Sequence, residues 1–278
     1  MISARTRLAG VIGDPVRHSL SPVLHNAAYR ELGLDWVYVA FEVRAGAAVP
    51  ALAGLRALGI VGCSVTMPHK TAVAEACDEL SPVAAALRSA NTVTVVGDRL
   101  VGDSTDGPGF LAALADAGVE SAGRSVLICG AGGAARAVAD ALGRSGARVR
   151  VSARRPEAAA VAAGLAGGDT VPWPDRDRAA SEVDIVVNAT PLGMGADAGL
   201  VVAADAFGPD RVVVDLVYHP LETALLAAAR ERGATAVDGL GMLVHQAARQ
   251  VRSWTGHEPP IAAMRAAAHA ALTEREHA

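Results

Sequence analysis

Short apolar runs alternate along this chain with longer segments in which small apolar residues recur at helical spacing. Runs of the first kind predict strands, and segments of the second kind predict helices. The expected strands are residues 7–13, 36–41, 60–66, 92–96, 99–102, 126–129, 148–152, 183–188, 211–215 and 235–237. The expected helices include residues 21–33, 47–58, 69–77, 81–89, 240–254 and 260–272. This alternation is typical of an α/β fold with largely parallel sheets.

Local signals predict how several of these elements begin and end. Ser21 followed by Pro22 predicts a helix N-cap with proline in the first helical position. Gly97-Asp98, between two alternating runs, predicts the turn of a β-hairpin. The segment 164–178 contains glycine, proline and aspartate, and we expect it to be a mobile surface loop.

A glycine-rich turn stands at the centre of the sequence. The apolar run 126–129 leads into Gly130, Ala131, Gly132, Gly133, Ala134 and Ala135, and then into an alanine-rich helical stretch. Strand, glycine turn and helix in this order form the dinucleotide-binding fingerprint. Gly130 allows the tight turn, and Gly132 lets the backbone approach a pyrophosphate at the positive end of the helix. The sequence therefore predicts one α/β domain over residues 1–105 and a Rossmann domain over residues 106–239.

The end of the next expected strand bears on the choice of dinucleotide. Folds that bind NAD carry an acidic residue there for the ribose 2′-hydroxyl, but this chain has Ser152, Ala153, Arg154 and Arg155. Two guanidinium groups suit a 2′-phosphate, because arginine pairs with phosphate through two hydrogen bonds. We therefore expect NADP rather than NAD as cofactor. The alternative is a solvated basic turn ahead of a helix that starts near Pro156.

Composition narrows the class of protein. The chain has 278 residues, of which 51% are hydrophobic and only 3% aromatic, so its cores must consist mainly of alanine, valine and leucine. A net charge of −4 without a long basic block argues against nucleic acid and membrane partners. The N-terminus lacks the apolar region of a signal peptide, and no apolar run is long enough to span a membrane. Three cysteines outside any Cys-x-x-Cys arrangement indicate the cytoplasm, and no residue cluster has metal-ligand spacing.

In open α/β sheets ligands bind beyond the carboxyl ends of the strands, so polar residues near predicted strand ends are the candidates for chemistry. These candidates are Ser19, Ser21, Thr66, Lys70, Asn91, Thr92, Asp103, Ser104, Thr105, Asp106, Asn188, Thr190, Asp215 and Tyr218. A dense set of hydroxyl and amide groups suits a small polyhydroxylated substrate, because each substrate hydroxyl needs a donor or an acceptor.

Lys70 and Asp106 form the best candidate pair for proton transfer at a carbonyl group. Desolvation in a cleft favours the neutral form of a lysine, and an adjacent carboxylate would hold the side chain in place. The alternatives are a solvated lysine in the first turn of a helix, and an aspartate that caps a helix beginning at Gly107. Several histidines could also act as bases, although none has an obvious carboxylate partner in the sequence. They are His18, His25, His69, His219 and His245.

Seven motifs resemble those of the shikimate dehydrogenase family, and they cover nearly the whole chain. They are Ser19-Leu20-Ser21-Pro22, Ser64-Val65-Thr66-Met67-Pro68-His69-Lys70, Ala90-Asn91-Thr92, Gly102-Asp103-Ser104-Thr105-Asp106-Gly107, the loop from Gly130 to Ala135, Asn188-Ala189-Thr190, and the segment from Asp238 to Ala247. The resemblance implies the reversible, NADPH-dependent reduction of 3-dehydroshikimate to shikimate in aromatic amino acid biosynthesis. It also implies that the C-terminal helices, residues 240–278, join an N-terminal substrate domain, with the active-site cleft between the two domains.

The resemblance also implies a role for individual residues. Lys70 and Asp106 would be the catalytic pair, with Lys70 as acid and base. The substrate would be bound by Ser19, Ser21, Thr66, Asn91, Tyr218 and Gln246. The cofactor would be bound by Gly130, Ala131, Gly132, Gly133, Ala134, Arg154, Arg155, Thr190, Gly239 and Met242. The expected enzyme is a cytoplasmic monomer or homodimer without a metal.

Three positions depart from the family pattern. Ser64 and Ser104 stand where the family usually has asparagine, and Ala153-Arg154-Arg155 stands for its Asn-Arg-Thr block. The first alternative is a quinate/shikimate dehydrogenase that uses NAD, which the arginine pair and the serine at position 21 disfavour. A non-catalytic NADP-binding regulator would have no need for the pair of Lys70 and Asp106. A reductase of another small carbonyl compound would need a different pocket lining.

Overall fold

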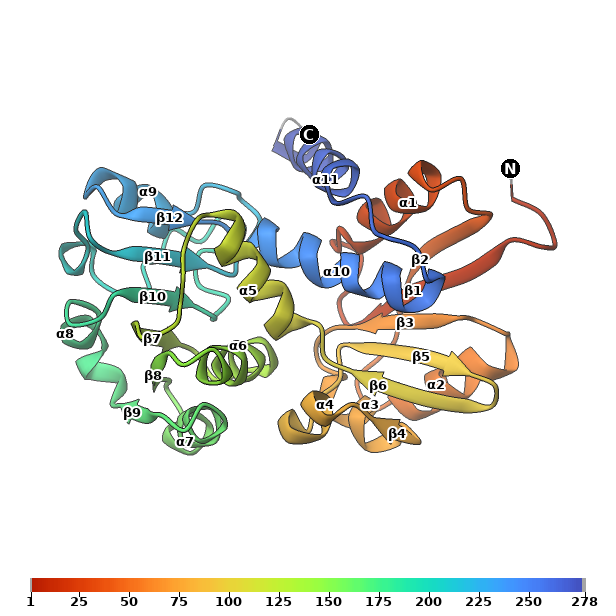
Figure 1. Ribbon diagram of the computed structural model, residues 1–278, viewed down its shortest axis with the longest axis horizontal. Coiled ribbons are helices and arrows are strands. Elements are labelled where there is room, and N and C mark those ends of the chain that lie inside the picture. Colours follow the sequence, from red (N-terminus) through yellow and green to blue (C-terminus); the bar gives the residue numbers. More distant parts are fainter. Residues whose placement is uncertain (1, 277–278) are drawn as a thin grey trace. The chain divides into compact units, whose positions relative to one another are not determined.

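The computed structural model describes residues 2–276. They form two compact units, of which one holds the residues up to Thr105 together with those from Val244 onward, and the other spans Asp106–Leu243. Each unit contains a six-stranded sheet with helices packed against it (Figure 1). Within the described residues, no helix is long and apolar enough to cross a membrane.

The first unit has a mixed sheet in the order β2-β1-β3-β5-β6-β4. Its strands are β1 Arg7–Gly13, β2 Trp36–Glu42, β3 Gly62–Val65, β4 Glu79–Leu80, β5 Thr92–Val96 and β6 Arg99–Asp103. β1 runs parallel to β2 and β3, whereas β5 is antiparallel to β3 and to β6, with which it forms the predicted hairpin. The carboxyl ends of β1, β3 and β6 and the beginning of β5 therefore share one edge of the sheet.

Helices cover both faces of this sheet. They are α1 Ser21–Glu31, α2 Ala48–Ala57, α3 Lys70–Ala76, α4 Pro82–Leu87, α11 Ile261–Glu276 and the later part of α10 Gly239–Thr255. Cys63 and Val65 share a core with Leu52 of α2 and Val73 of α3. On α10, Trp254 Nε1 donates a hydrogen bond to the carbonyl oxygen of Val93 over 3.2 Å, so α10 lies directly against β5.

The start of α1 differs from the prediction. Ser21 is the first helical residue and not the N-cap, which is Leu20 and makes no side-chain capping bond. The backbone N–H of Ser21 instead donates to Ser19 Oγ over 3.2 Å. The prediction of Ser21 as the cap was wrong because the hydroxyl of Ser19 already supplies an acceptor at the helix start.

The second unit has an all-parallel sheet in the order β12-β11-β10-β7-β8-β9. Its strands are β7 Ser125–Cys129, β8 Arg148–Ser152, β9 Asp169–Val171, β10 Ile185–Asn188, β11 Val212–Asp215 and β12 Thr235–Val237. The chain leaves β7 toward one side of the sheet and returns to β10 on the other side. The point between β7 and β10 is thus the topological switch point, where ligands bind in open α/β sheets.

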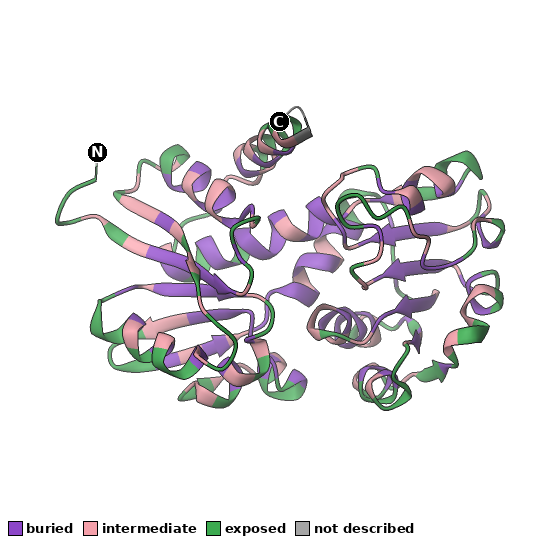
Figure 2. Ribbon diagram, turned by 180° about the vertical axis from the view of Figure 1, so that it is seen from behind, coloured by how far each residue is buried: buried purple, intermediate pink, exposed green. Residues whose placement is uncertain are grey.

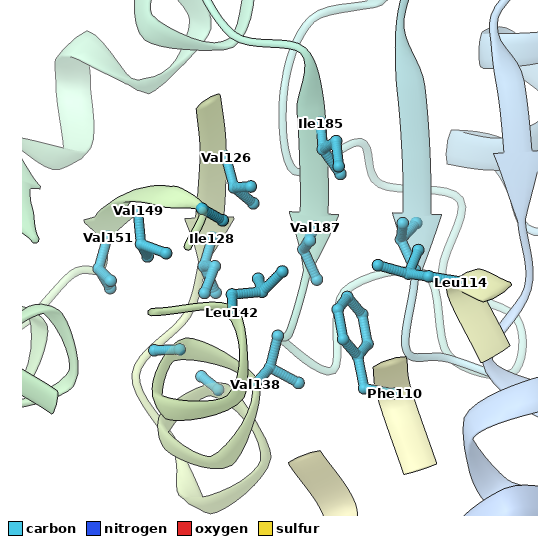
Figure 3. Packing of buried hydrophobic residues seen from close by; sticks show 14 of the residues in the cluster. Phe110, Leu114, Val126, Ile128, Val138, Leu142, Val149, Val151, Ile185 and Val187 are labelled. Carbon is cyan, nitrogen blue, oxygen red and sulfur yellow. The ribbon is translucent and has the colours of Figure 1, made fainter. Parts of the chain in front are cut away.

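Alternating side chains of the second sheet enter two different cores. Its helices are α5 Asp106–Asp116, α6 Gly133–Arg144, α7 Pro156–Leu165, α8 Arg176–Ala180 and α9 Ala224–Glu231, with 3₁₀ turns at Trp173–Asp175 and Ala204–Ala206. Val126 and Ile128 pack with Leu142 of α6 and Phe110 of α5 on one face (Figure 3). Leu127 lies on the other face with residues of α8 and α9. Because both faces are covered, the central strands β7, β10 and β11 are buried along most of their length (Figure 2).

The prediction of a mobile loop over residues 164–178 was wrong. This segment contains the edge strand β9, the 3₁₀ turn Trp173–Asp175 and the start of α8. Val171 is buried, and the Arg176 guanidinium donates hydrogen bonds to the carbonyl oxygens of Val201 and Trp173 over 2.7 and 2.9 Å. A three-residue strand is too short to show an alternating pattern, so its polar neighbours dominate the sequence signal.

Candidate active site

Several predicted site residues come together at one edge of the first sheet. Ser19 and Ser21 follow β1, Thr66 follows β3, and Asn91 directly precedes β5. The Thr66 N–H donates to the carbonyl oxygen of Ile12 over 3.0 Å, so the loop after β3 is fastened to β1. Because β5 runs antiparallel to β3, its first residues lie at this edge. Asn91, which precedes β5, is therefore near residues that follow β1 and β3.

Lys70 is the first residue of α3, directly after the loop that carries Thr66. The N–H of His69 donates to the Thr66 carbonyl oxygen over 3.0 Å, and this bond starts the turn into the helix. Lys70 is also the only lysine among the 25 lysine and arginine residues of the sequence. An arginine keeps its proton in proteins, so Lys70 is the one cationic side chain of this type that can exchange a proton. The sequence interpretation overlooked this signal.

Asn91 is held in a single orientation by hydrogen bonds to two neighbours, Thr92 and Thr105. The Thr105 N–H donates to Asn91 Oδ1 over 2.8 Å, and the Thr92 hydroxyl donates to the same oxygen over 2.8 Å. A backbone N–H can only donate, so the atom that faces it must be the amide oxygen. Asn91 Nδ2 donates to Thr105 Oγ1 over 3.0 Å. The residue after Thr105 is Asp106, which is 7% exposed.

Asp106 opens helix α5 as its first residue, one position earlier than the predicted start at Gly107. Gly107 faces α6 closely, since a Cβ at this position would lie 2.7 Å from the carbonyl oxygen of Ala137. Asp106 thus stands in the first turn of a helix, where the helix dipole stabilises a negative charge.

The two serines that depart from the family pattern are both buried and form hydrogen bonds. Ser64 Oγ accepts a hydrogen bond from the Tyr38 hydroxyl over 2.6 Å and donates to Gln250 Oε1 over 2.7 Å. The Ser104 N–H donates to Asp103 Oδ1 over 2.7 Å. Sequence reasoning missed Tyr38 and Gln250. The available signal was a glutamine one helical turn after Gln246, on the same face of an amphipathic helix.

Two of the candidate histidines have structural roles. His25 stacks on Tyr38, with ring centroids 4.0 Å apart, and its Nδ1 lies 2.8 Å from the carbonyl oxygen of Ser21. Burial lowers the pKa of His25 to about 4, so the ring is neutral at physiological pH. His69 is buried as well, with Nε2 2.7 Å from the carbonyl oxygen of Val43.

The glycine turn of the second unit leaves room for an anion. Gly130 has φ +117°, and a Cβ there would lie 2.7 Å from the carbonyl oxygen of Ala189. A Cβ on Gly132 would meet no atom within 4 Å, which leaves open space beside the backbone. Helix α6 begins at Gly133 with no side-chain cap and no acidic residue in its first turn. Open backbone and uncapped N–H groups at a helix start fit the pyrophosphate of a dinucleotide.

Two arginines follow β8, the strand beside β7. The backbone ends of these strands are joined, because the Gly130 N–H donates to the Ser152 carbonyl oxygen over 2.8 Å. Arg154 and Arg155 are both exposed, and Arg155 is the N-cap residue of α7 without a side-chain capping bond. Their position beyond a strand end next to the glycine turn fits a ribose 2′-phosphate.

A buried polar network supports the loop after β10. Asn188 Oδ1 accepts from the backbone N–H and the hydroxyl of Thr190 over 3.0 and 2.7 Å, and Asn188 Nδ2 donates to Asp215 Oδ1 over 2.9 Å. Asp215 also accepts from the Thr223 hydroxyl over 2.8 Å. Burial raises the pKa of Asp215, against the effect of these hydrogen bonds. Asn188 and Asp215 are thus internal supports, and Thr190 is the residue they hold in place.

Helix α10 carries three of the predicted site residues. Asp238 Oδ1 accepts from the N–H groups of Leu240 and Gly241 over 3.0 and 3.3 Å and so caps the helix. Gly239 and Met242 lie in the first turn, within the second unit, and Gln246 lies beyond Val244 in the first unit. Tyr218, in the loop after β11, is half-buried.

Among the residues the structure describes, no group of three histidine, cysteine or carboxylate side chains could hold a metal ion.

Comparisons with known proteins decide the family. Residues 11–93 match the model of the shikimate dehydrogenase substrate binding domain, and residues 239–269 match that of the shikimate 5′-dehydrogenase C-terminal domain. A shikimate dehydrogenase (NADP(+)) of Moorella thermoacetica is 45% identical over 95% of this chain and 92% of the relative. The chain belongs to the shikimate dehydrogenase family. The family predicted from the motifs is therefore confirmed.

Two further members of the shikimate dehydrogenase family are similar over nearly their full length. The shikimate dehydrogenase (NADP(+)) of Gluconobacter oxydans is 46% identical over 93% of this chain and 94% of the relative. The crystal structure of shikimate 5-dehydrogenase from Thermus thermophilus, in complex with NADP(H) and shikimate, has a TM-score of 0.90 and 38% identity. That match covers 96% of this chain and 100% of the other. The predicted fold of two α/β sheets, one of them of the Rossmann type, is confirmed.

Proposed function

We propose that this chain is an NADP-dependent oxidoreductase that catalyses the reversible reduction of 3-dehydroshikimate to shikimate. Identity of about 45% with NADP-dependent shikimate dehydrogenases, over nearly the full length of both chains, supports this reaction. The structural observation that carries the proposal is the shared edge of the first sheet. There the Val65 N–H donates to the Asn91 carbonyl oxygen over 2.7 Å and the Ala90 N–H donates to that of Lys70 over 3.0 Å, so the backbone segments that carry Thr66, Lys70 and Asn91 adjoin.

The substrate binds to the first domain, residues 1–105 with the C-terminal helices 240–278. Ser19 and Ser21 hold the substrate carboxylate through their hydroxyl groups. The substrate hydroxyls or carboxylate are contacted by Thr66, Asn91, Tyr218 and Gln246. Neutral hydroxyl and amide groups discriminate strongly against compounds that lack a matching hydroxyl, because the protein groups would then be left without partners.

Lys70 carries the proton in the reaction. During reduction its ammonium group donates a proton to the carbonyl oxygen of 3-dehydroshikimate, and during oxidation the neutral amine takes the proton from the shikimate hydroxyl. The positive charge of the ammonium group also stabilises the negative charge that develops on this oxygen. Asp106 completes the pair as the carboxylate that orients Lys70.

The cofactor is NADP, which supplies or accepts the hydride when bound. The residues that hold it lie in the second domain, residues 106–239, and in the first turns of α10. The turn Gly130, Ala131, Gly132, Gly133 and Ala134 binds the pyrophosphate at the start of α6. Arg154 and Arg155 bind the 2′-phosphate. Thr190 and Met242 line the nicotinamide side, and Gly239 also binds the cofactor.

We place the enzyme in the cytoplasm as a monomer or homodimer, with small molecules rather than nucleic acid or membranes as partners. Purified protein given shikimate and NADP should form reduced nicotinamide, followed by its absorbance. The reverse reaction, with 3-dehydroshikimate and NADPH, should consume it. A protein that binds NADP but supports neither direction would contradict the proposal.

A further inference from the structure

Gln250 connects two strands that carry predicted substrate-binding residues. It lies on α10, one turn after Gln246, and its side chain is fully buried. Its Oε1 accepts a hydrogen bond from the Ser64 hydroxyl over 2.7 Å, and its Nε2 donates to Thr92 Oγ1 over 2.9 Å. The amide therefore bridges β3, two residues before Thr66, and β5, one residue after Asn91.

The hydrogen bonds around Gln250 run in one direction. Tyr38 donates its only hydroxyl proton to Ser64 over 2.6 Å, and Ser64 donates its own proton to Gln250 Oε1. A hydroxyl has one proton to give, so Ser64 can only accept from Tyr38. The NH₂ group of Gln250 then donates a hydrogen bond to Thr92 Oγ1. The Thr92 hydroxyl in turn donates a hydrogen bond to Asn91 Oδ1 over 2.8 Å. Every donor in the series finds an acceptor.

This order supplies one of the two hydrogen bonds that hold the Asn91 amide oxygen in place. Asn91 Oδ1 is the acceptor for both the Thr92 hydroxyl and the Thr105 N–H. If Thr92 received no hydrogen bond from Gln250, its hydroxyl could rotate to donate elsewhere, and one of the two bonds that hold Asn91 Oδ1 would be lost. Buried hydrogen-bond networks fix a unique arrangement when all their members are satisfied.

We propose that Gln250 is a positioning residue for substrate binding, which through Thr92 helps to hold the Asn91 amide in its orientation. This role rests on the proposed function, in which Asn91 contacts shikimate. Gln250 itself contacts β3 and β5 from the side of α10 and acts on the substrate only through its neighbours. Loss of its hydrogen bonds lowers the affinity for shikimate and does not change the glycine turn of the second unit.

The variant Gln250→Met tests this role because methionine has a similar length and volume but no amide. We expect the KM for shikimate to rise about tenfold, the effect of losing roughly one hydrogen bond to the bound substrate, with the KM for NADP unchanged. The matched control is Trp254→Phe, one turn further along α10, which removes the buried bond to Val93 but lies outside the series that ends at Asn91. It should lower the melting temperature without changing the KM for shikimate.

Thr92→Val provides a second, independent test of the same series and serves if Gln250→Met does not fold. It should raise the KM for shikimate to a similar extent, and the double variant should be no worse than the more affected single variant. An unchanged KM for shikimate in either folded variant would overturn the proposal. So would an equal rise in the KM values for shikimate and NADP, since that indicates a general loss of structure.

Hydrogen exchange separates a failure of this inference from a failure of the proposed function. The Thr105 amide, which donates to Asn91 Oδ1, should exchange faster in Gln250→Met than in the wild type, in the absence of any ligand. Faster exchange in a protein whose wild type does not oxidise shikimate would support the positioning of Asn91 and reject the substrate. Equal exchange in the two proteins would reject the positioning itself.

Discussion

The carbonyl oxygen of Lys70 accepts a hydrogen bond from the backbone N–H of Ala90 over 3.0 Å. This bond fastens the first turn of α3 to the residue that precedes Asn91. It involves only backbone atoms, so a substitution of the Lys70 side chain leaves it in place. Variants at position 70 therefore report on the chemistry of the side chain and not on the course of the chain.

Replacement of Lys70 should abolish most of the turnover. General acid–base catalysis typically contributes a factor of about 10² to 10⁴, and we expect kcat to fall by this amount in Lys70→Ala with little change in shikimate affinity. Lys70→Arg should lose nearly as much, because a guanidinium keeps the charge but does not release its proton. Steady-state kinetics and equilibrium binding of shikimate would measure both effects. Wild-type turnover in either variant would refute the role of Lys70.

The single lysine also allows a chemical test without substitution. An amine-reactive reagent can modify only Lys70 and the chain's α-amino group, since the sequence has no other lysine. Modification should inactivate the wild type, and bound shikimate should slow the inactivation. The Lys70→Arg protein is the control, because the α-amino group is then the only amine that the reagent can modify. Its residual activity should be the same before and after treatment.

Substitution of the arginines after β8 should change the preference between the two dinucleotides. Arg154→Ala and Arg155→Ala should raise the KM for NADP much more than that for NAD, because only NADP carries the 2′-phosphate. Arg148→Ala is the matched control: this arginine begins the same strand at its opposite end and donates to the carbonyl oxygen of Gly123 over 2.7 Å. Parallel changes for both dinucleotides would show that the pair does not recognise the phosphate.

The two glycines of the turn should respond differently to the same substitution. Gly130→Ala places a side chain at a residue with φ +117° and against the backbone of Ala189. The free energy of unfolding should therefore fall by about 2 kcal/mol or more. Gly132→Ala has ordinary φ and free space, so it should keep its stability but bind NADP more weakly. Thermal unfolding and dinucleotide titration separate the two effects. Full NADP affinity in Gly132→Ala would contradict the position of the pyrophosphate.

His25 should make the stability of the protein depend on pH. Its pKa is lowered from 6.5 to about 4 by burial, so between these values the unfolded chain binds a proton that the folded chain does not. Above pH 6.5 the ring is neutral in both states, and the free energy of unfolding is not reduced by His25. As the pH falls from 6.5 toward 4, protonation of the unfolded chain lowers the free energy of unfolding by up to about 3 kcal/mol. Denaturant unfolding of wild type and His25→Gln at several pH values would measure this difference. An identical pH dependence in both proteins would contradict it.

The regular parts of the fold could be predicted because their patterns are long or repeated. The β7 strand followed by Gly130 and an alanine-rich helix combined an apolar run, a turn and a helical period in one stretch. The short strands β4 and β9, of two and three residues, showed no pattern because an alternation needs more positions. The same limit explains why residues 164–178 resembled a loop.

Side-chain partners that are distant in the sequence could not be predicted. Ser64 and Gln250 are 186 positions apart, and only the folding of α10 onto the sheet brings them together. Asn188 and Asp215 were interpreted as groups facing a ligand, since both follow strands, yet both are buried and bind each other. A sequence shows which residues end a strand, but whether their side chains turn inward depends on contacts with other strands.

The central claim is the reaction, and a rate assay with four combinations of substrate and cofactor tests it most directly. Purified protein would be given shikimate or quinate, each with NADP or NAD, and the formation of reduced nicotinamide would be followed. We predict rapid turnover with shikimate and NADP and little in the other three mixtures. Turnover that favours quinate and NAD would contradict the account, and Arg154 and Arg155 would then be ordinary surface residues.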